Sequence, residues 1–199
     1  MKVSMFPKFN APDRGDGGIR RVCEALLAGL PKYGVEFVDK AEDADLTHCH
    51  AGNIADPPGV PMISSNHGLY WSNYEWPSWA DDSNAQIIQA LSISSAVTAP
   101  SKWVANALRR GMLIDPTVIY HGVDADDWQP ADNPQDFILW NKARLDVISQ
   151  PTEVEELARR LPKRSFISTM PMRIEKPPNV NVTGAMTFMA MKGLVAHAG

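Results

Sequence analysis

The sequence predicts an α/β fold in which helices cover a parallel sheet. Two observations carry this prediction. Short runs of β-branched and apolar residues recur along the chain, and between them apolar residues repeat at the three-and-four spacing of a helix face. Strands that alternate with helices in this way form parallel sheets. Of the 199 residues, 44% are apolar and 21% are charged, so the chain has enough apolar surface to fold.

The first part of the chain predicts six short strands joined by helices. The expected strands are Val3–Phe6, Val35–Val38, Leu46–Cys49, Met62–Ser65, Ala96–Ala99 and Thr117–Tyr120. Three helices lie between them, at the positions where the apolar spacing changes. Their expected signals are Pro31 and Gly34 at the end of the first, Asp82 or Ser83 as cap of the second, Ser101 as cap of the third, and Gly111 at its end.

A polar segment bounded by proline, Gln129–Pro134, separates this part from a second, similar alternation. The excess charge changes there from negative to positive. We therefore expect a complete domain at residues 1–130 and an incomplete one at 131–199. The elements expected in the second are strands Phe137–Trp140, Ser165–Thr169 and Val180–Val182, a helix with a Thr152 and Glu155 capping box, and a final helix with its apolar face from Phe188 to Ala198.

Histidines follow two of the predicted strands. His48 and His50 flank Cys49 at the end of one strand, and His67 follows the next. Ligands of parallel α/β sheets bind outside the carboxyl ends of strands, so the three histidines are expected to point towards one crevice. His48 also fits a structural role within its strand, and the His-x-His pair alone fixes no third metal ligand. His67 is the best functional candidate because Gly68 allows a sharp turn after it.

Glycines and aromatic residues give two weaker signals. Gly17 and Gly18 end a glycine-rich loop at the start of the first helix, where backbone N–H groups can bind an anion. A flexible turn is the alternative, since neither a dinucleotide fingerprint nor a P-loop is present. Trp71 and Tyr74 belong to a stretch that holds three of the six tryptophans. Such aromatic faces stack on sugar rings or bases, or simply pin a loop by packing.

The order of several motifs resembles that of the retaining GT-B glycosyltransferases of family four. His121 replaces the asparagine usual in that family, but Gly122, Val123 and Asp124 match. The stretches that carry the resemblance are Gly17–Ile19, Asp45–His50, Asn66–Gly68, Ala99–Trp103, Val118–Asp124, Trp128–Pro130, Phe137–Trp140, Ala143–Leu145 and Asn179–Gly184.

The resemblance implies a GT-B-like α/β fold with two Rossmann-like domains, acceptor-side at 1–130 and donor-side at 131–199. It implies catalytic roles for His67, near the transferred sugar, and for Arg144, near the donor phosphates. Together with the glycine and aromatic signals, we expect donor and acceptor binding by Gly17, Gly18, His50, Asn66, Gly68, Trp71, Tyr74 and Lys142. No metal and no cofactor are implied beyond a nucleotide-sugar donor such as a UDP- or GDP-sugar.

The leading hypothesis is therefore a retaining hexosyltransferase-type glycosyltransferase that moves a sugar from a nucleotide-sugar to a sugar or other small acceptor. The family lysine expected about five residues after Arg144 and the later glutamate motif have no counterpart, so we expect weak activity from this chain alone. One alternative is a non-catalytic binding or assembly module, with a second chain completing the C-terminal domain or with a homo-oligomer. Another is a further GT-B enzyme such as a sugar epimerase or phosphorylase.

The net charge and the cysteines limit where the protein can be located and what it can bind. The net charge of −4 gives no electrostatic reason to expect nucleic acid. No apolar run approaches the about 18 to 20 residues of a membrane helix, and the N-terminus lacks the features of a signal peptide. Cys23 and Cys49 form no disulfide framework, which agrees with a reducing compartment. We therefore expect a cytoplasmic protein without a transmembrane segment.

Overall fold

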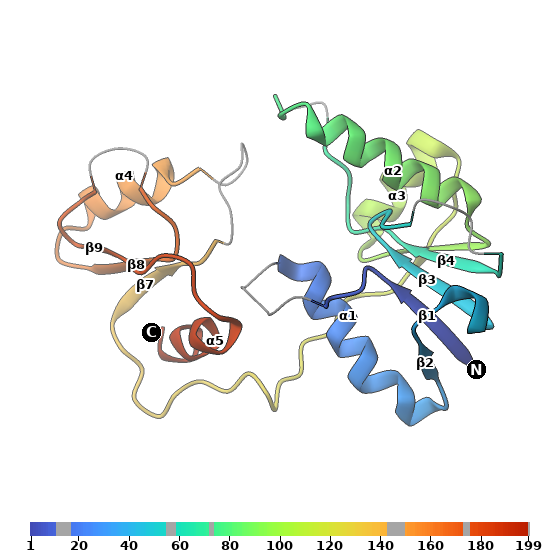
Figure 1. The fold of residues 1–199 in the computed structure, drawn as a ribbon. Helices are drawn as coiled ribbons and strands as arrows, with labels where there is room; N and C mark the ends of the chain where they lie inside the picture. Colours follow the sequence, from blue (N-terminus) through green and yellow to red (C-terminus); the bar gives the residue numbers. More distant parts are fainter. Residues whose placement is uncertain (11–16, 55–58, 72–73, 143–149, 173–175, 199) are drawn as a thin grey trace. The chain divides into compact units, whose positions relative to one another are not determined.

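The computed structural model describes residues 1–10, 17–54, 59–71, 74–142, 150–172 and 176–198 (Figure 1). The chain divides into two compact units. The first consists of Met1–Asn10 and Gly18–Gly122, and the second centres on Val123–Gly199.

The first unit contains a six-stranded, fully parallel sheet in the order β2-β1-β3-β4-β5-β6. The strands are β1 Lys2–Phe6, β2 Glu36–Val38, β3 Leu46–His50, β4 Met62–Ser65, β5 Ala96–Ala99 and β6 Thr117–Val118. The winding direction reverses beside β1, which lies between β2 and β3. In open parallel sheets such a reversal marks the edge at which ligands bind.

Helices cover both faces of this sheet, with α1 on one side and α2 and α3 on the other (Figure 1). The helical elements are α1 Gly17–Gly29, η1 Leu30–Tyr33, η2 Ala41–Asp43, α2 Trp79–Ile93 and α3 Lys102–Met112. Ser101 caps α3 as predicted, because its Oγ accepts a hydrogen bond from the Val104 N–H at 3.2 Å.

The predicted start of α2 is wrong. The helix begins at Trp79, where the Ala80 N–H donates to the Pro77 carbonyl at 2.9 Å, so the first turn forms before Asp82. Asp82 lies in that first turn, where a carboxylate interacts favourably with the helix dipole. Ser83 lies inside the helix and donates its hydroxyl to the Trp79 carbonyl at 3.0 Å.

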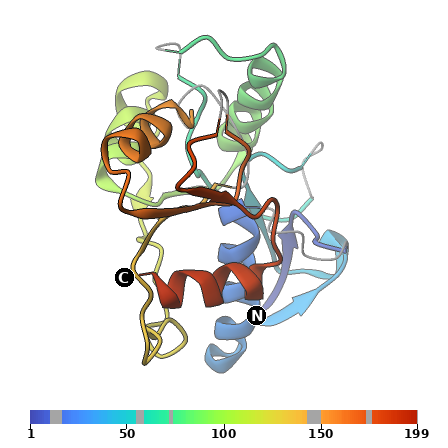
Figure 2. The same ribbon diagram turned by 90° about the vertical axis from the view of Figure 1, so that its left-hand side faces the viewer.

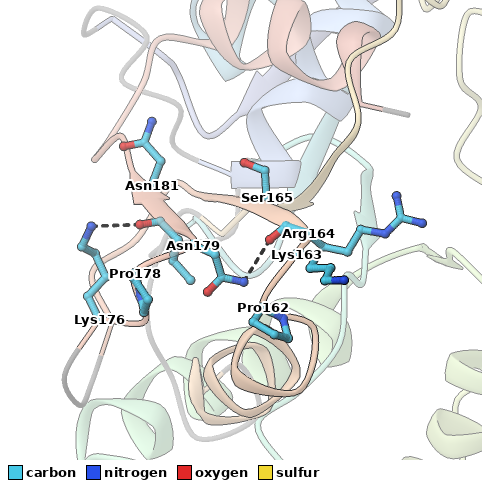
Figure 3. Close-up of a pocket in the computed structure, with 9 residues that line it drawn as sticks. Pro162, Lys163, Arg164, Ser165, Lys176, Pro178, Asn179 and Asn181 are labelled. Atoms are coloured by element: carbon cyan, nitrogen blue, oxygen red, sulfur yellow. Dashed lines mark hydrogen bonds between the residues drawn. The ribbon is translucent and has the colours of Figure 1, made fainter.

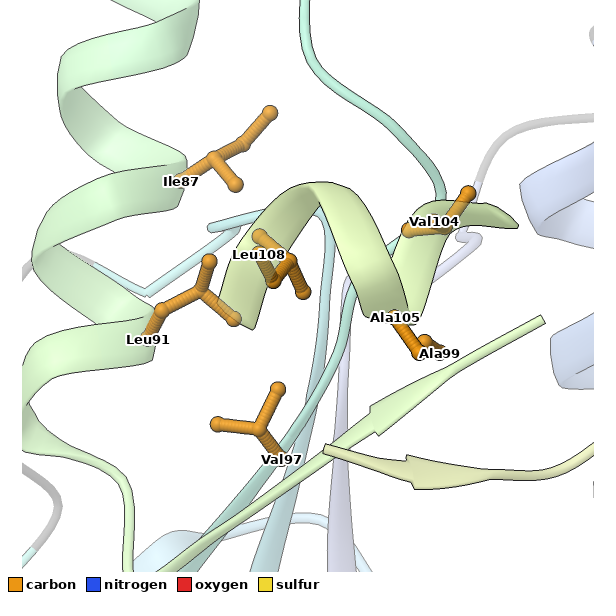
Figure 4. Close-up of a cluster of buried hydrophobic side chains, with 7 residues drawn as sticks. All are labelled: Ile87, Leu91, Val97, Ala99, Val104, Ala105 and Leu108. Carbon is orange, nitrogen blue, oxygen red and sulfur yellow. The ribbon is translucent and has the colours of Figure 1, made fainter. Parts of the chain in front are cut away.

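The main core of the first unit lies between β5, α2 and α3 (Figure 4). Side chains from the three elements meet there and exclude water. They are Ile87, Leu91, Val97, Ala99, Val104, Ala105 and Leu108. Full burial of one such leucine contributes about 1.5 to 3 kcal/mol, so this cluster anchors both helices to the sheet.

The second unit has a three-stranded parallel sheet in the order β7-β8-β9. Its elements are β7 Phe137–Trp140, α4 Thr152–Arg160, β8 Ser165–Ser168, β9 Val180–Val182 and α5 Phe188–His197. Figures 1 and 2 show α4 and α5 on opposite sides of the sheet. Ala158, Phe166 and Val180 form its core.

The capping box predicted at Thr152 and Glu155 is wrong. Pro151 occupies the cap position without a side-chain cap bond, and its carbonyl accepts the Glu155 N–H at 2.9 Å. Thr152 is therefore already helical, and Glu155 is buried inside the unit. The side-chain cap in this unit is Thr187, whose Oγ1 accepts from the Ala190 N–H at the start of α5.

Candidate active site at the carboxyl edge of the first sheet

Four histidines lie together at the carboxyl edge of the first sheet. His48 and His50 come from the end of β3, His67 follows β4, and His121 follows β6. We call these four residues the histidine row. Its ring centroids are separated by 4.2 Å between His48 and His50, 5.2 Å between His50 and His67, and 5.2 Å between His67 and His121.

The row runs from the interior to the surface. His50 is 1% exposed, His67 is half-buried and His121 is exposed. Nδ1 of His50 and Nε2 of His67 are 2.9 Å apart, so one ring donates a hydrogen bond to the other. The parallel strands thus bring together the three histidines that the sequence singled out.

His48 has a polar partner within the sheet. Its Nε2 lies 2.7 Å from the Ser65 hydroxyl, which lies 2.8 Å from the Thr98 hydroxyl. His48 also lies two residues before His50, and residues two apart face the same side of a strand. The structural and the functional interpretations of His48 are therefore compatible, because the same ring that bonds to Ser65 also packs on His50.

Burial keeps His48, His50 and His67 uncharged. Desolvation lowers the pKa of His48 to about 4 and that of His67 to about 4. For His50 desolvation and, to a smaller extent, the neighbouring imidazoles lower the pKa to about 3. These three rings are neutral at pH 7, so each nitrogen that carries a proton acts as a neutral hydrogen-bond donor.

The turn after β4 holds His67 in place. The Asn66 backbone N–H donates to the Thr98 carbonyl at 3.0 Å, and the Asn66 side-chain oxygen accepts from the Gly68 N–H. Gly68 has a φ of 122°, which side-chain-bearing residues rarely adopt. The sharp turn expected at Gly68 is therefore present. Asn66 is 2% exposed, and its Nδ2 has no hydrogen-bond partner within the described residues.

The aromatic stretch after His67 is partly pinned and partly exposed. Asn84 holds Tyr70 through two hydrogen bonds of 2.9 and 2.8 Å, and the Trp76 indole N–H donates to the Trp71 carbonyl at 2.9 Å. Tyr74 is 49% exposed. Packing thus fixes the segment and leaves aromatic surface open, and the stacking role of this surface stays a prediction.

Sequence reasoning left two residues out of the site. Trp103 is 65% exposed, and its ring meets that of Trp71 edge to face at 5.8 Å. His121 belongs to the histidine row. An aromatic residue next to the Ser101 cap and a polar residue just after a strand were available as signals. Neither identifies its partner without the strand order.

The remaining predicted residues lie elsewhere. Gly17 and Gly18 open α1, and a Cβ added to either would meet no atom within 4 Å. Lys142 follows β7 in the second unit, where its backbone N–H donates to the Thr169 hydroxyl at 2.9 Å. Arg144 lies outside the described residues.

A pocket of about 480 Å³ lies at the amino edge of the second sheet, where β8 and β9 begin (Figure 3). Lys163 and Arg164 lie on one side of it and Lys176 on the other. Asn179 closes the adjoining turn, because its side-chain amide donates to the carbonyls of Ala158, Leu161 and Arg164 at 2.9 to 3.1 Å. In Figure 3 the cations do not converge on one point, so the pocket offers no focused anion site.

Across the described ranges, no three His, Cys, Asp or Glu side chains are placed to hold a metal ion. No helix in the described part of the chain is long and apolar enough to cross a membrane.

Comparison with known proteins places these features in context. Residues 34–127, which include the whole histidine row, match the model of Glycosyltransferase Family 4. The crystal structure of AviGT4, a glycosyltransferase involved in avilamycin A biosynthesis, is similar with a TM-score of 0.61 and 19% sequence identity. That match covers 99% of this chain and 67% of AviGT4. No curated protein matches by sequence. The predicted Rossmann-like α/β fold of the GT-B type is thereby confirmed.

Proposed function

We propose that the chain is a retaining glycosyltransferase that transfers a sugar from a nucleotide-sugar to an acceptor. One observation carries the proposal: the segment that matches Glycosyltransferase Family 4 is the segment that builds the histidine row at the ligand-binding edge of a Rossmann-like sheet. The match to Glycosyltransferase Family 4 suggests sugar transfer as the reaction. The histidine row provides buried polar side chains at the edge where a Rossmann-like sheet is expected to bind ligands.

In this proposal His67 contacts the transferred sugar. Burial holds its pKa at about 4, so the ring is neutral and acts by hydrogen bonding rather than by charge. Asn66 and Gly68 fix the turn that carries it. The exposed aromatic surface of Tyr74 stacks on a sugar acceptor, and Trp71 lies close by because the Tyr74 N–H donates to its carbonyl at 3.4 Å.

Lys142 and Arg144 bind the donor phosphates in the proposed reaction. Positive charge near the diphosphate stabilises the leaving group as the bond between the sugar C1 and the phosphate oxygen breaks. The acceptor oxygen then bonds to C1, and its proton goes to the departing phosphate. Gly17 and Gly18 add backbone N–H groups at the start of α1.

The surroundings of the row are compatible with the front-side route that the resemblance to the retaining family implies. The interactions recorded for the described part of the row involve hydroxyls and other imidazoles, with no carboxylate among them. A double-displacement mechanism uses two carboxylates about 5 Å apart. Transfer on the same face of the sugar as the leaving group needs no protein nucleophile, and we propose that route.

The test is an assay of the purified chain against a panel of UDP- and GDP-sugars with sugar acceptors, read by product mass and anomeric configuration. His67→Ala removes this hydrogen-bond donor and is expected to lower turnover at least about 100-fold. His197→Ala is the matched control, since His197 lies in α5 and bonds to the Gly193 carbonyl. Absence of transfer, of hydrolysis and of nucleotide-sugar binding across the panel would overturn the proposal. An inverted product would overturn only the retaining route.

A second candidate function is a non-catalytic assembly module, and α5 is the observation that favours it. This helix has the apolar sequence FMAMKGLVAH, yet none of its residues is buried and Met189 is 69% exposed. A partly exposed apolar helix favours association with a second copy of the chain. Light scattering distinguishes the two: a dimer that Met189→Lys converts to a monomer supports assembly, and a monomer at all concentrations contradicts it.

A further inference from the structure

The hydrogen bond between His50 and His67 contains one proton that can belong to either ring. Nδ1 of His50 and Nε2 of His67 are 2.9 Å apart. A neutral imidazole carries its proton on one nitrogen and a lone pair on the other. The direction of this bond therefore decides the tautomers of both rings.

The other nitrogen of His50 settles the direction. Nε2 of His50 is buried and has no hydrogen-bond partner within the described residues. If His50 accepted at Nδ1, its proton would be on Nε2, as a buried N–H without an acceptor. Leaving a buried donor unsatisfied is costly, and orphaned N–H groups are rarer in proteins than under-used acceptors. A bare Nε2 lone pair is the more favourable alternative.

We propose that His50 is a positioning residue that donates its Nδ1–H to Nε2 of His67 and so fixes His67 in the Nδ1–H tautomer. Nε2 of His67 is then occupied, and its proton is on Nδ1. No hydrogen bond to Nδ1 of His67 is recorded within the described residues. The ring thus presents a neutral N–H donor at that nitrogen.

The neighbours of the pair maintain this arrangement. His48 packs on His50 with ring centroids 4.2 Å apart and is itself held by Ser65. His121 packs beside His67 at 5.2 Å. A carboxylate bonded to Nδ1 or Nε2 would change which tautomer is favoured. None is among the interactions recorded for the described residues of the row.

The consequence for ligand recognition rests on the proposed function. A fixed Nδ1–H donor hydrogen-bonds to an oxygen of the transferred sugar, such as a hydroxyl. With Nε2 occupied and Nδ1 protonated, His67 has no lone pair left to accept a proton from the acceptor. His67 therefore acts in this site as an orienting donor and not as a general base.

The direct test reads the tautomer of His67 in the intact chain. Long-range proton–nitrogen NMR correlations with ¹⁵N-histidine distinguish the two tautomers, and a His67→Gln variant assigns the signal among the five histidines. The wild-type ring is expected as Nδ1–H. His50→Asn, which keeps an amide N–H near the place of Nδ1, is expected to preserve it, and His50→Phe is expected to release Nε2–H. A wild-type Nε2–H tautomer, or an unchanged tautomer in His50→Phe, overturns the proposal.

A kinetic test separates this proposal from the proposed function. If the chain transfers sugar, His50→Phe is expected to lower kcat roughly 10- to 100-fold with little change in KM, and His50→Asn to restore most of it. If no nucleotide-sugar is turned over, the proposed function fails while the NMR result still decides the tautomer. The wild-type spectrum, assigned with His67→Gln, decides the tautomer without His50→Phe, so a folding defect in His50→Phe does not affect the result.

Discussion

Nε2 of His48 lies 2.7 Å from the hydroxyl of Ser65, although the two residues are 17 positions apart in sequence. The same hydroxyl lies 2.8 Å from that of Thr98. Neighbouring parallel strands β3, β4 and β5 thus place three polar side chains in one line across the sheet. This line supports the buried end of the histidine row.

Removing the Ser65 hydroxyl should destabilise the first unit. Ser65→Ala leaves a polar atom of His48 without its partner, which is expected to lower the free energy of unfolding by about 1 to 3 kcal/mol. Urea denaturation measures this change. Ser92→Ala is the control, because the exposed Ser92 hydroxyl bonds to the carbonyl of Gln89 in its own helix. Equal losses in the two variants would contradict a special role for Ser65.

Stability should fall in mild acid. Burial lowers the pKa of His48 to about 4, that of His50 to about 3 and that of His67 to about 4, from an ordinary value of 6.5. Between pH 6.5 and 4 the unfolded chain therefore binds more protons than the folded one. The stability contributed by the neutral rings is complete above pH 6.5 and decreases below it, by about 2 kcal/mol per histidine at pH 5.

Urea denaturation from pH 4.5 to 8 tests whether the free energy of unfolding decreases as the pH falls. The groups recorded around the row are His48, His50, His67 and His121, with the hydroxyls of Ser65 and Thr98. His67→Asn should make the pH dependence shallower by about one proton, whereas His197→Asn in α5 should not. A flat profile between pH 5 and 6.5 would show that the rings are not held neutral.

Truncation of Leu108 should open a cavity in the core drawn in Figure 4. This side chain is 1% exposed and packs between α2 and β5. Leu108→Ala is expected to cost about 2 to 5 kcal/mol in calorimetry or denaturant unfolding. Leu113→Ala, at a position 94% exposed, is expected to change stability by less than about 0.5 kcal/mol. Similar effects of the two changes would be incompatible with this core.

Gly52 should not tolerate a side chain. Its φ is 70°, and a Cβ there would lie 2.6 Å from the backbone nitrogen of Ile87 in α2. Gly52→Ala is expected to destabilise the first unit by at least about 2 kcal/mol through backbone strain and overpacking. Gly111→Ala has the opposite expectation, since Gly111 lies in α3 with open space around it, and alanine favours the helix by about 0.5 to 1 kcal/mol. Thermal unfolding of both variants checks the two signs.

Local patterns predicted most of the secondary structure. The strands at Met62–Ser65, Ala96–Ala99, Phe137–Trp140 and Val180–Val182 have the bounds expected from their apolar runs. The Ser101 cap is also as expected. Helix starts were less predictable, because Trp79 and Thr152 begin their helices after a proline carbonyl that accepts the first backbone bond, without a side-chain cap.

The same distinction applies to the candidate site: some of its residues could be predicted from the sequence, but the contacts between them could not. Sequence alone identified His50 and His67 as residues at the ends of strands, and the carboxyl ends of parallel strands meet at one edge. It did not indicate that Nδ1 of His50 bonds to Nε2 of His67, that His121 packs beside His67, or that Trp103 packs against Trp71. Those contacts depend on which strand lies beside which.

Local patterns were enough to predict the α/β class, most strand positions, and the histidines at the ends of β3 and β4. Spacing and caps depend on near neighbours in the chain, so they can be read locally. Only the tertiary structure decided that β4, β5 and β6 follow β3 in the sheet. That order places His121 beside His67 and buries Nε2 of His50, because burial and ring contacts arise from packing between distant segments.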